Sequence, residues 1–387
     1  MGGYYVGRER KARRAYGFDE VALVPGDKTI DPQDIDISWK IGDLSFKIPI
    51  LAAAMDGVVD VNFAIQMGKL GGLAVLNLGG IQTRYEDPYR VIEEIVHSSS
   101  KEAVEILQKI YREPIKEELI EKRIKEIKKA KVPVAVSCIP QQAKKFGPIA
   151  QEAGADIFVV QATVVTAKYV SSSKEALDLK SFCQQMSIPV IAGNCVTYKA
   201  AYELMETGIE ALLVGVGPGA ACTTREVLGV GVPQVTATMD AAAARDDYLK
   251  SSGRYVSIIT DGGMITGGDI CKALASGADA VMIGSAFARA KEAPGKGYHW
   301  GMATSDENLP RGARVRVGTT GTLKEILYGP ARLDDGSQNL AWAIKTSMSY
   351  CGVSTIKQMH NVEMVIAPAI KSEGKFFQDV QRIAKIR

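Results

Sequence analysis

The chain has 387 residues, 46% of them hydrophobic, and a formal net charge of +3 at pH 7. This length and composition allow a large buried core, in one big domain or two smaller ones. The nearly balanced charge predicts neither a nucleic-acid-binding nor a membrane-binding protein, and no apolar run reaches membrane-spanning length. The chain starts without an apolar signal segment, and its six cysteines and three histidines lack metal-type spacing. These features favour a cytoplasmic protein without a structural zinc site.

Short apolar runs rich in Val, Ile and Ala recur along the chain, with amphipathic stretches such as Pro88–Ile110 and Pro233–Leu249 between them. The eight runs are Ile48–Met55, Leu73–Asn77, Val132–Cys138, Asp156–Thr163, Pro189–Asn194, Ala211–Gly217, Ser257–Gly263 and Ala280–Ser285. Continuous apolar strands that alternate with helices are typical of a parallel sheet covered on both faces. Eight such units in one domain predict a single (β/α)₈ TIM barrel rather than an open doubly wound sheet.

Two intervals break the regular spacing. Lys101–Lys131, after the second strand, is rich in Lys and Glu and is interrupted by Pro114, so we expect a short, exposed helical excursion. Ala286–Gly336, after the eighth strand, is dense in Gly, Pro and charged residues and is too long for an ordinary connection. We expect this second interval to form an active-site flap. Residues 1–387 are therefore expected to be one catalytic domain.

Cys222 is the residue that points most directly to chemistry, because it follows a strand in the glycine-rich segment Gly215–Arg225. The glycines allow a tight loop that presents the thiol at the carboxyl end of the strand Ala211–Val214. A cysteine on a polar loop is a candidate nucleophile, whereas one inside a strand or helix usually serves packing. Packing is expected for three other cysteines, Cys138, Cys183 and Cys271.

The same glycines nearly fit a Rossmann dinucleotide fingerprint, which is the competing interpretation of this segment. Pro218 stiffens the turn, however, and no acidic strand end follows about twenty residues later, as that fold requires. The nucleophile interpretation is therefore preferred.

The last two strand ends predict where a nucleotide binds, because TIM barrels often hold phosphate after strands seven and eight. Strand seven ends in Asp261–Gly263 and strand eight in Gly284-Ser285, where backbone N–H groups can bind an anion. Asp261 would repel phosphate, so we assign it to the hydroxyl groups of a ribose. A phosphate cradle, a ribose-binding carboxylate and a thiol after strand six together predict a nucleotide that is attacked covalently at its base.

Several segments extend this pattern: Ile48–Asp56, Gly193-Asn194, Val214–Arg225, Thr260–Gly263, Val281–Ser285 and Gly301-Met302. Together they resemble the IMP dehydrogenase/GMP reductase family over the stretch from Phe18 to Gly352. The resemblance implies a barrel that binds a purine mononucleotide, a nucleophilic cysteine that attacks C2 of the base, a nicotinamide cofactor and a homotetramer.

The resemblance also implies roles for individual residues. Cys222 is the nucleophile and Thr224 the hydroxyl that assists the attacking or leaving group. The nucleotide is assigned to Met55, Asn194, Gly219, Asp261, Gly262, Gly263, Gly284, Ser285, Gly301 and Met302. The cofactor is assigned to Gln161, Thr163, Lys168, Asn194, Gly215 and Gly217. The carbonyl groups of Gly217, Gly219 and Cys222 are assigned to a monovalent cation such as K⁺.

The chain departs from the family pattern at several positions. Lys101–Lys131 is too short to hold the family's pair of regulatory domains of the cystathionine-β-synthase type. Ala53 and Ala220 stand where the family has serines, which implies fewer or rearranged phosphate contacts. Gln161 stands where the family has a cofactor-side aspartate.

The flap bears on the direction of the reaction. IMP dehydrogenases carry an Arg-Tyr pair there that activates water, but only seven residues separate Met302 from Pro310 and they contain no such pair. Arg311 stands where a Glu or Gln usually precedes the glycine. We therefore expect a GMP reductase: Cys222 adds to C2 of GMP, ammonia departs, and a hydride from NADPH gives IMP. Glu307 is the candidate acid beside Thr224.

Two alternatives remain. An NAD-dependent IMP dehydrogenase would use the same adduct and then hydrolyse it, with Arg311 or Arg314 activating water. A non-catalytic nucleotide-binding paralogue is the alternative from another class, because TIM barrels host many functions. For the cofactor, NADPH requires a cation at its adenosine 2′-phosphate, and Lys168 and Lys174 are the candidates after strand four.

Overall fold

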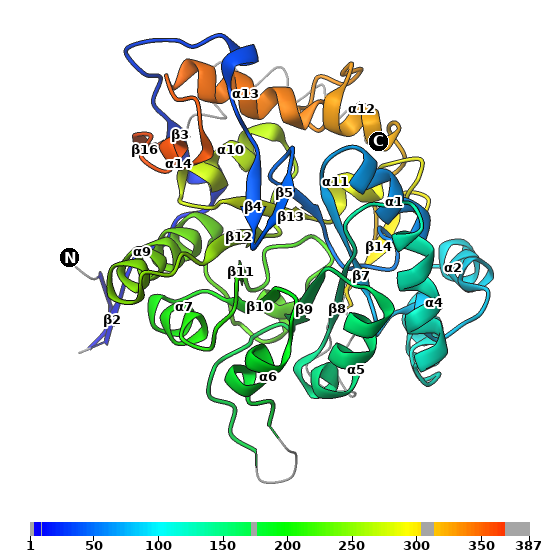
Figure 1. Cartoon of the computed structure of the whole chain (residues 1–387). Helices are drawn as coiled ribbons and strands as arrows, with labels where there is room; N and C mark the ends of the chain where they lie inside the picture. Colours follow the sequence, from blue (N-terminus) through cyan, green and yellow to red (C-terminus); the bar gives the residue numbers. More distant parts are fainter. Residues whose placement is uncertain (1–3, 9, 172–175, 303–312, 368–387) are drawn as a thin grey trace.

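The computed structural model describes residues 4–8, 10–171, 176–302 and 313–367. Eight parallel strands form a closed barrel at its centre (Figure 1). They are β6 (Ile50–Ala52), β7 (Leu73–Asn77), β8 (Ala135–Cys138), β9 (Ile157–Gln161), β10 (Val190–Cys195), β11 (Ala211–Val214), β12 (Ser257–Asp261) and β13 (Ala280–Ile283). Pairing of β13 with β6 closes the ring. Each strand coincides with one of the eight predicted apolar runs, although β10 continues one residue further, to Cys195, so the predicted (β/α)₈ barrel is confirmed.

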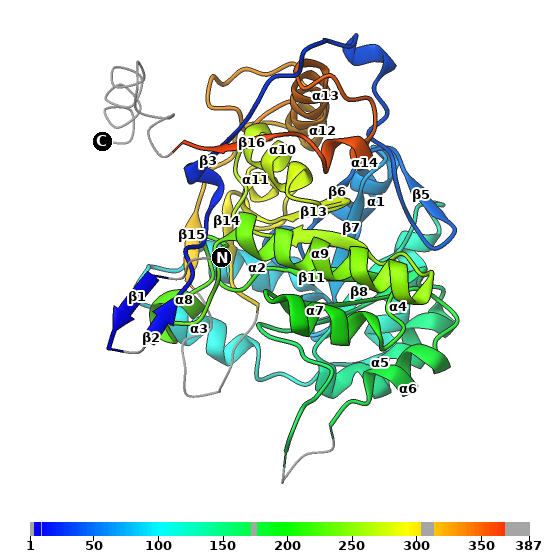
Figure 2. The ribbon, with the colours of Figure 1, turned by 90° about the vertical axis from the view of Figure 1, so that its left-hand side faces the viewer.

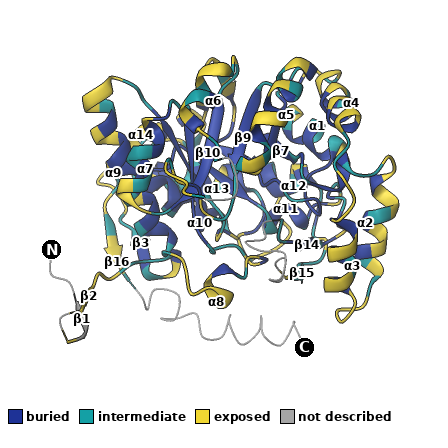
Figure 3. Ribbon diagram, turned by 90° about the horizontal axis from the view of Figure 1, so that it is seen from below, coloured by how far each residue is buried: buried dark blue, intermediate teal, exposed yellow. Residues whose placement is uncertain are grey.

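The strands are apolar throughout because both of their faces are buried. In β7, Leu73 and Val75 face the barrel interior, whereas Ala74 and Leu76 face the surrounding helices. Alternate residues point to opposite faces of a strand, so a strand that is covered on both sides has no polar face. Figure 3 shows the buried strands at the centre and exposed residues on the outer faces of the helices.

Helices surround the barrel in chain order (Figure 1). They are α1 (Val61–Lys69), α4 (Glu117–Lys128), α5 (Pro140–Ala153), α6 (Leu179–Gln185), α7 (Tyr198–Met205), α9 (Gln234–Ser252), α10 (Gly267–Ala275), α12 (Leu323–Tyr328) and α13 (Leu340–Tyr350). Several begin at a residue whose side chain accepts a hydrogen bond from the first turn, as Asp60, Thr197 and Thr266 do. The Ala-rich helix predicted over Pro233–Leu249 is confirmed as α9.

A hairpin of β4 (Trp39–Ile41) and β5 (Leu44–Phe46) closes the amino-terminal end of the barrel. Trp39 and Phe46 belong to the apolar cluster of the barrel interior, and their ring centroids lie 5.1 Å apart. The carboxyl ends of the strands are left to form the ligand site, as in other TIM barrels.

Smaller elements lie at the periphery. β3 (Val21–Leu23) pairs with β16 (Met364–Ile366), and β1 (Tyr4–Gly7) pairs with β2 (Arg10–Ala12), which extends away from the barrel (Figure 2). The short helices are η1 (Phe18–Glu20), η2 (Pro32–Asp34), η3 (Ile81–Thr83), α8 (Thr224–Val227), α11 (Ser285–Ala288) and α14 (Ile356–Met359). Among the described residues, no helix has the length and apolar character needed to cross a membrane.

The segment after β7 differs from our expectation. The predicted helix Pro88–Ile110 is two helices, α2 (Pro88–His97) and α3 (Ala103–Ile110), because Ser98 adopts an extended conformation that ends the first. The expected exposed excursion is exposed only in part. Helix α4 is an ordinary member of the helix layer, with Ile120, Ile124 and Ile127 in the main core and Leu119 also buried. The high content of Lys and Glu led us to expect an exposed segment, although the apolar residues lie on one face of the helix.

The segment after β13 contains ordered elements on both sides of the flap. An antiparallel ribbon of β14 (Tyr298–Trp300) and β15 (Arg314–Arg316) forms the flap base. Helix α12 buries Leu323, Ile326 and Leu327 and belongs to the helix layer, so the flap itself is shorter than the predicted Ala286–Gly336. Residues 303–312, which include the candidates Glu307 and Arg311, lie outside the described residues.

Candidate active site

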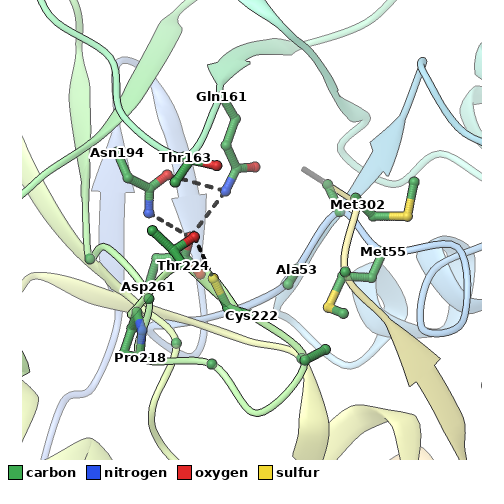
Figure 4. A pocket seen from close by; sticks show the side chains of 18 of the residues that line it. Ala53, Met55, Gln161, Thr163, Asn194, Pro218, Cys222, Thr224, Asp261 and Met302 are labelled. Carbon is green, nitrogen blue, oxygen red and sulfur yellow. Dashed lines mark hydrogen bonds between the residues drawn. The ribbon is translucent and has the colours of Figure 1, made fainter. Parts of the chain in front are cut away.

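A cleft opens at the carboxyl ends of the barrel strands (Figure 4). Most of the predicted site residues line it: Met55, Gln161, Thr163, Asn194, Gly215, Gly217, Gly219, Cys222, Thr224, Asp261, Gly262, Gly263, Gly284, Ser285, Gly301 and Met302. Lys168 does not line the cleft, and Glu307 lies outside the described residues. Segments that are far apart in the sequence therefore meet at one site.

Cys222 lies in the loop between β11 and α8, and its thiol donates a 3.2 Å hydrogen bond to the hydroxyl of Thr224. Of the six cysteines, Cys222 alone is exposed. Burial raises the pKa of the Cys183, Cys195 and Cys271 thiols to about 12, because a buried thiolate loses its hydration. Packing roles for Cys138 in β8, Cys183 in α6 and Cys271 in α10 are as expected. The geometry therefore singles out Cys222 as the accessible thiol of the cleft.

Arg225 holds the cysteine loop in shape, a role that the sequence analysis did not assign. Its guanidinium donates to the carbonyl group of Val216 (3.1 Å) in the loop and to that of Val232 (2.7 Å) after α8. The aliphatic part of Arg225 crosses Gly217, whose φ is +75°, and a Cβ there would lie 2.5 Å from Cγ of Arg225. Gly217 is thus required both by its left-handed backbone and by this close approach.

Asp261 ends β12 and accepts two amide hydrogen bonds at the same carboxylate oxygen. Asn194 Nδ2 lies 2.8 Å away and Gln161 Nε2 lies 3.0 Å away. Burial raises the pKa of the Asp261 carboxyl to about 6, and the two hydrogen bonds offset only part of that effect. Gln161 was expected on the cofactor side of the site, but its amide points to the carboxylate assigned to the ribose (Figure 4).

At the predicted phosphate end, the hydroxyl of Ser285 lies 3.2 Å from Nε2 of His299. His299 is 1% exposed, lines the cleft, and its Nδ1 has no hydrogen-bond partner among the described residues. Burial lowers the pKa of this imidazole to about 4, so the ring is neutral at pH 7. The sequence analysis missed His299, because a single histidine before Gly301-Met302 carries no spacing signal.

The predicted cofactor and cation residues fit in part. Thr163 and Asn194 present hydroxyl and amide groups to the cleft, the types of group that bind a carboxamide and ribose hydroxyls. Gly215 also lines the cleft, and it has no room for a side chain, because a Cβ there would lie 2.3 Å from the backbone oxygen of Asp261. Backbone carbonyl oxygens can bind an alkali cation. The Gly219 carbonyl oxygen, however, already accepts a 3.0 Å hydrogen bond from the Cys222 amide, so only one of its two lone pairs remains for a cation. Across the described ranges, no His, Cys, Asp and Glu side chains cluster as metal ligands.

Two cations that were given roles in catalysis or cofactor binding are engaged elsewhere. Lys168 forms a 2.8 Å salt bridge with Glu203 on the surface. Arg314 donates to the Ile95 carbonyl, to Ser98 Oγ at 2.8 Å and to the Ser98 carbonyl at 3.0 Å, at the end of α2. These contacts give Arg314 a structural role and do not support its alternative role as a water-activating base.

A TIM barrel with an exposed loop thiol, a half-buried carboxylate and glycine-rich strand ends at one mouth has the features expected of an enzyme that binds a nucleotide. The comparisons with known proteins agree and are more specific. The chain belongs to the IMP dehydrogenase/GMP reductase family, since the family model of the IMP dehydrogenase / GMP reductase domain matches residues 15–375. It is therefore an oxidoreductase of a family that binds purine mononucleotides and uses a nicotinamide cofactor.

Individual relatives cover nearly the whole chain. An uncharacterized oxidoreductase of Mycolicibacterium smegmatis is 38% identical over 93% of this chain and 99% of its own length. An inosine-5′-monophosphate dehydrogenase of Methanocaldococcus jannaschii is 26% identical over 94% of this chain and 95% of its own length. The crystal structure of an IMP dehydrogenase/GMP reductase-like protein from Corynebacterium glutamicum matches with a TM-score of 0.89 and 35% identity, covering 94% of this chain and 97% of that one.

Proposed function

We propose that this protein transfers a hydride at C2 of a purine mononucleotide through a covalent adduct with Cys222. The observation that carries the proposal is the exposed Cys222 thiol, 3.2 Å from the Thr224 hydroxyl, in a cleft shared with Asp261. The Cys222 thiolate would attack C2 while Asp261 orients the ribose, and Thr224 would exchange a proton with the group that enters or leaves. Thr163 and Asn194 would hold the nicotinamide nucleotide, which supplies the hydride acceptor or donor.

For the direction, we propose oxidation of IMP with NAD, in place of the GMP reduction expected from the flap. The pairing of Lys168 with Glu203 weakens the support for a cation at the 2′-phosphate of NADPH, and the other candidate, Lys174, lies outside the described residues. Relatives that match along the chain from M. jannaschii and Streptococcus pyogenes are named inosine-5′-monophosphate dehydrogenases. After hydride departure, water would add at C2 and the C–S bond would break to release XMP. Arg311 is then the candidate water-activating residue.

GMP reduction with NADPH remains a second candidate reaction because of the short segment after Met302. The segment between Met302 and Pro310 is short and has no Arg-Tyr pair. A protein without water activation can still reduce GMP, because that reaction needs an acid near the departing amine, for which Thr224 with Glu307 is the candidate.

The test compares two reactions by absorbance of the reduced nicotinamide band. Purified protein is given IMP plus NAD, or GMP plus NADPH, with Cys222→Ser as the control in both. We expect IMP oxidation to be faster, and Arg311→Ala to slow it by about 10²–10⁴-fold, the usual worth of general-base help. A faster GMP reaction would establish the second candidate. Nucleotide binding without either reaction would establish the non-catalytic paralogue.

Assembly and cation use are also part of the proposal, and membership of the family is what supports them. We expect a homotetramer, measurable by light scattering of the purified chain. We also expect turnover to rise when Na⁺ is replaced by K⁺, through the carbonyl groups of Gly217, Gly219 and Cys222. Equal rates in both salts would remove the cation assignment.

A further inference from the structure

A buried hydrogen-bond network joins the α2–α3 hairpin to the base of the flap. The Tyr111 hydroxyl, just after α3, donates to Asp56 Oδ2 at 2.6 Å and accepts from Trp300 Nε1 at 2.8 Å. The Ile81 amide donates to the same oxygen of Asp56 at 2.8 Å. Tyr111 is 6% exposed, Asp56 1% and Trp300 0%. Such bonds are strong in a dry interior, and loss of one partner leaves buried polar groups unpaired.

This network touches the cleft from two sides. Asp56 directly follows Met55, and Trp300 directly precedes Gly301-Met302; both methionines line the cleft and lie together on the side opposite Asp261 (Figure 4). The Sδ atom of Met302 lies 3.3 Å from the Tyr111 hydroxyl oxygen. One hydroxyl group therefore connects the two chain segments that carry Met55 and Met302.

The hairpin also holds the second strand of the flap ribbon. Arg314 of β15 donates to the Ile95 and Ser98 carbonyl groups at the end of α2, where a cation also suits the helix dipole. Its guanidinium lies over the Tyr298 ring of β14, 5.0 Å from the centroid. Apolar side chains complete the contact, since Ile95 and Trp300 belong to one buried cluster. Figure 3 shows α2 and α3 beside β14 and β15.

We propose that the α2–α3 hairpin positions the subsite for the purine base and that Tyr111 is its key positioning residue. Tyr111 does not contact the reacting atoms. Its hydroxyl holds Trp300 in place relative to Asp56. Because Met302 follows Trp300 and Met55 precedes Asp56, the distance between the two methionines is thereby fixed. The inference rests on the proposed function, because it identifies this side of the cleft as the place of the base.

The test is Tyr111→Phe, which removes the hydroxyl and keeps the ring. We expect the Kd for IMP, measured by calorimetry, to rise about tenfold, the order of effect of losing one buried hydrogen bond. The Kd for ribose 5-phosphate, which has no base, should stay within about twofold of the parent value. Asp56→Asn is a second variant at the same contact and should act in the same direction.

Tyr85→Phe is the matched control. The Tyr85 hydroxyl donates to the Ile110 carbonyl at 3.0 Å in the same hairpin, but this contact does not reach Met302. This variant should bind both ligands as the parent does, with a similar thermal midpoint. Unchanged IMP affinity in Tyr111→Phe would overturn the inference, and so would equal weakening of IMP and ribose 5-phosphate. A parent protein that binds neither IMP nor GMP would overturn the proposed function itself, before any variant is compared.

Discussion

The Asn194 side-chain amide donates a 2.8 Å hydrogen bond to the Asp261 carboxylate, across the carboxyl ends of β10 and β12. This contact fixes the direction of a carboxylate whose pKa is raised to about 6 by burial. The free protein therefore holds Asp261 close to the point where it changes charge near neutral pH. The ionised carboxylate accepts hydrogen bonds from the ribose hydroxyl groups more strongly than the protonated form, which has become a donor at one oxygen.

Nucleotide affinity should consequently fall as the pH drops below 6. The raised pKa means that Asp261 is ionised above about pH 6 and becomes protonated as the pH falls through that value, so the binding-competent form is lost on the acid side. We expect the Kd for IMP to rise by up to about tenfold for each pH unit below 6. The nucleotide phosphate also titrates near this pH, so the comparison is with Asp261→Asn, whose weaker binding should show a shallower pH profile.

The ribose assignment of Asp261 has a separate test. Two charge-assisted hydrogen bonds contribute roughly 1.5–3 kcal/mol each, so Asp261→Ala should weaken nucleotide binding by an order of magnitude or more. The 2′-deoxy nucleotide should bind poorly to the parent protein and lose little further affinity in the variant. Equal affinity of the parent for ribo- and deoxynucleotide would remove the assignment.

Cys222→Ser should abolish turnover and leave nucleotide binding largely intact, because serine keeps the size of the side chain but is a poor nucleophile. In the parent, iodoacetamide should label Cys222 first. It is the exposed cysteine, whereas burial raises the thiol pKa of Cys138, Cys195 and Cys271. Peptide mass spectrometry measures both the order of labelling and its slowing by bound IMP. A variant that keeps most of its rate would disprove the covalent mechanism.

His299 should make the protein less stable in acid. Burial lowers the pKa of the imidazole to about 4, below its usual value, so the unfolded chain binds the proton first. Its contribution to the free energy of unfolding is complete above about pH 6.5 and is lost as the pH falls toward 4, by roughly 1–3 kcal/mol.

The measurement for His299 is denaturant unfolding of the parent and of His299→Gln between pH 7 and pH 4. Asp261 contributes with the opposite sign, since its pKa is raised, and it cancels in the difference between the two proteins. A constant difference in stability across this range would show that the imidazole has the same pKa in the folded and the unfolded protein.

The barrel and the Cys222 loop were predictable because their signals are local. A strand covered on both faces is an uninterrupted apolar run, and eight runs separated by helices admit few architectures. The glycines around Cys222 mark a strand end whether or not the rest of the fold is known. The break between α2 and α3 left a weaker signal, since apolar residues continue at helical spacing through both segments.

The contacts around Tyr111 could not be predicted, because they connect residues that are far apart in the sequence and share no sequence pattern. Trp300 lies 189 residues after Tyr111, and no periodicity tells which buried donor meets which acceptor. The same holds for Gln161, whose amide turns to Asp261, and for Arg314, whose guanidinium caps α2. A sequence identifies polar residues at strand ends, whereas their partners depend on the packing of distant segments.

The last prediction concerns Lys168 and the choice of cofactor. Its ammonium group is 2.8 Å from the carboxylate of Glu203 and is exposed, so it is already neutralised by a partner outside the cleft. Exposed salt bridges contribute about 0–1 kcal/mol, so breaking this one should hardly change stability. Lys168→Ala should therefore change the KM values for NADH and NADPH, or for NAD and NADP, by the same factor of less than about two.

Glu203→Gln is the matched control, because it frees the ammonium group without removing it. If the lysine binds a 2′-phosphate, the two variants should shift the preference in opposite directions, with Lys168→Ala raising the KM for the phosphorylated cofactor alone. That result would restore the original expectation of an NADPH-dependent enzyme and would make GMP reduction the leading proposal.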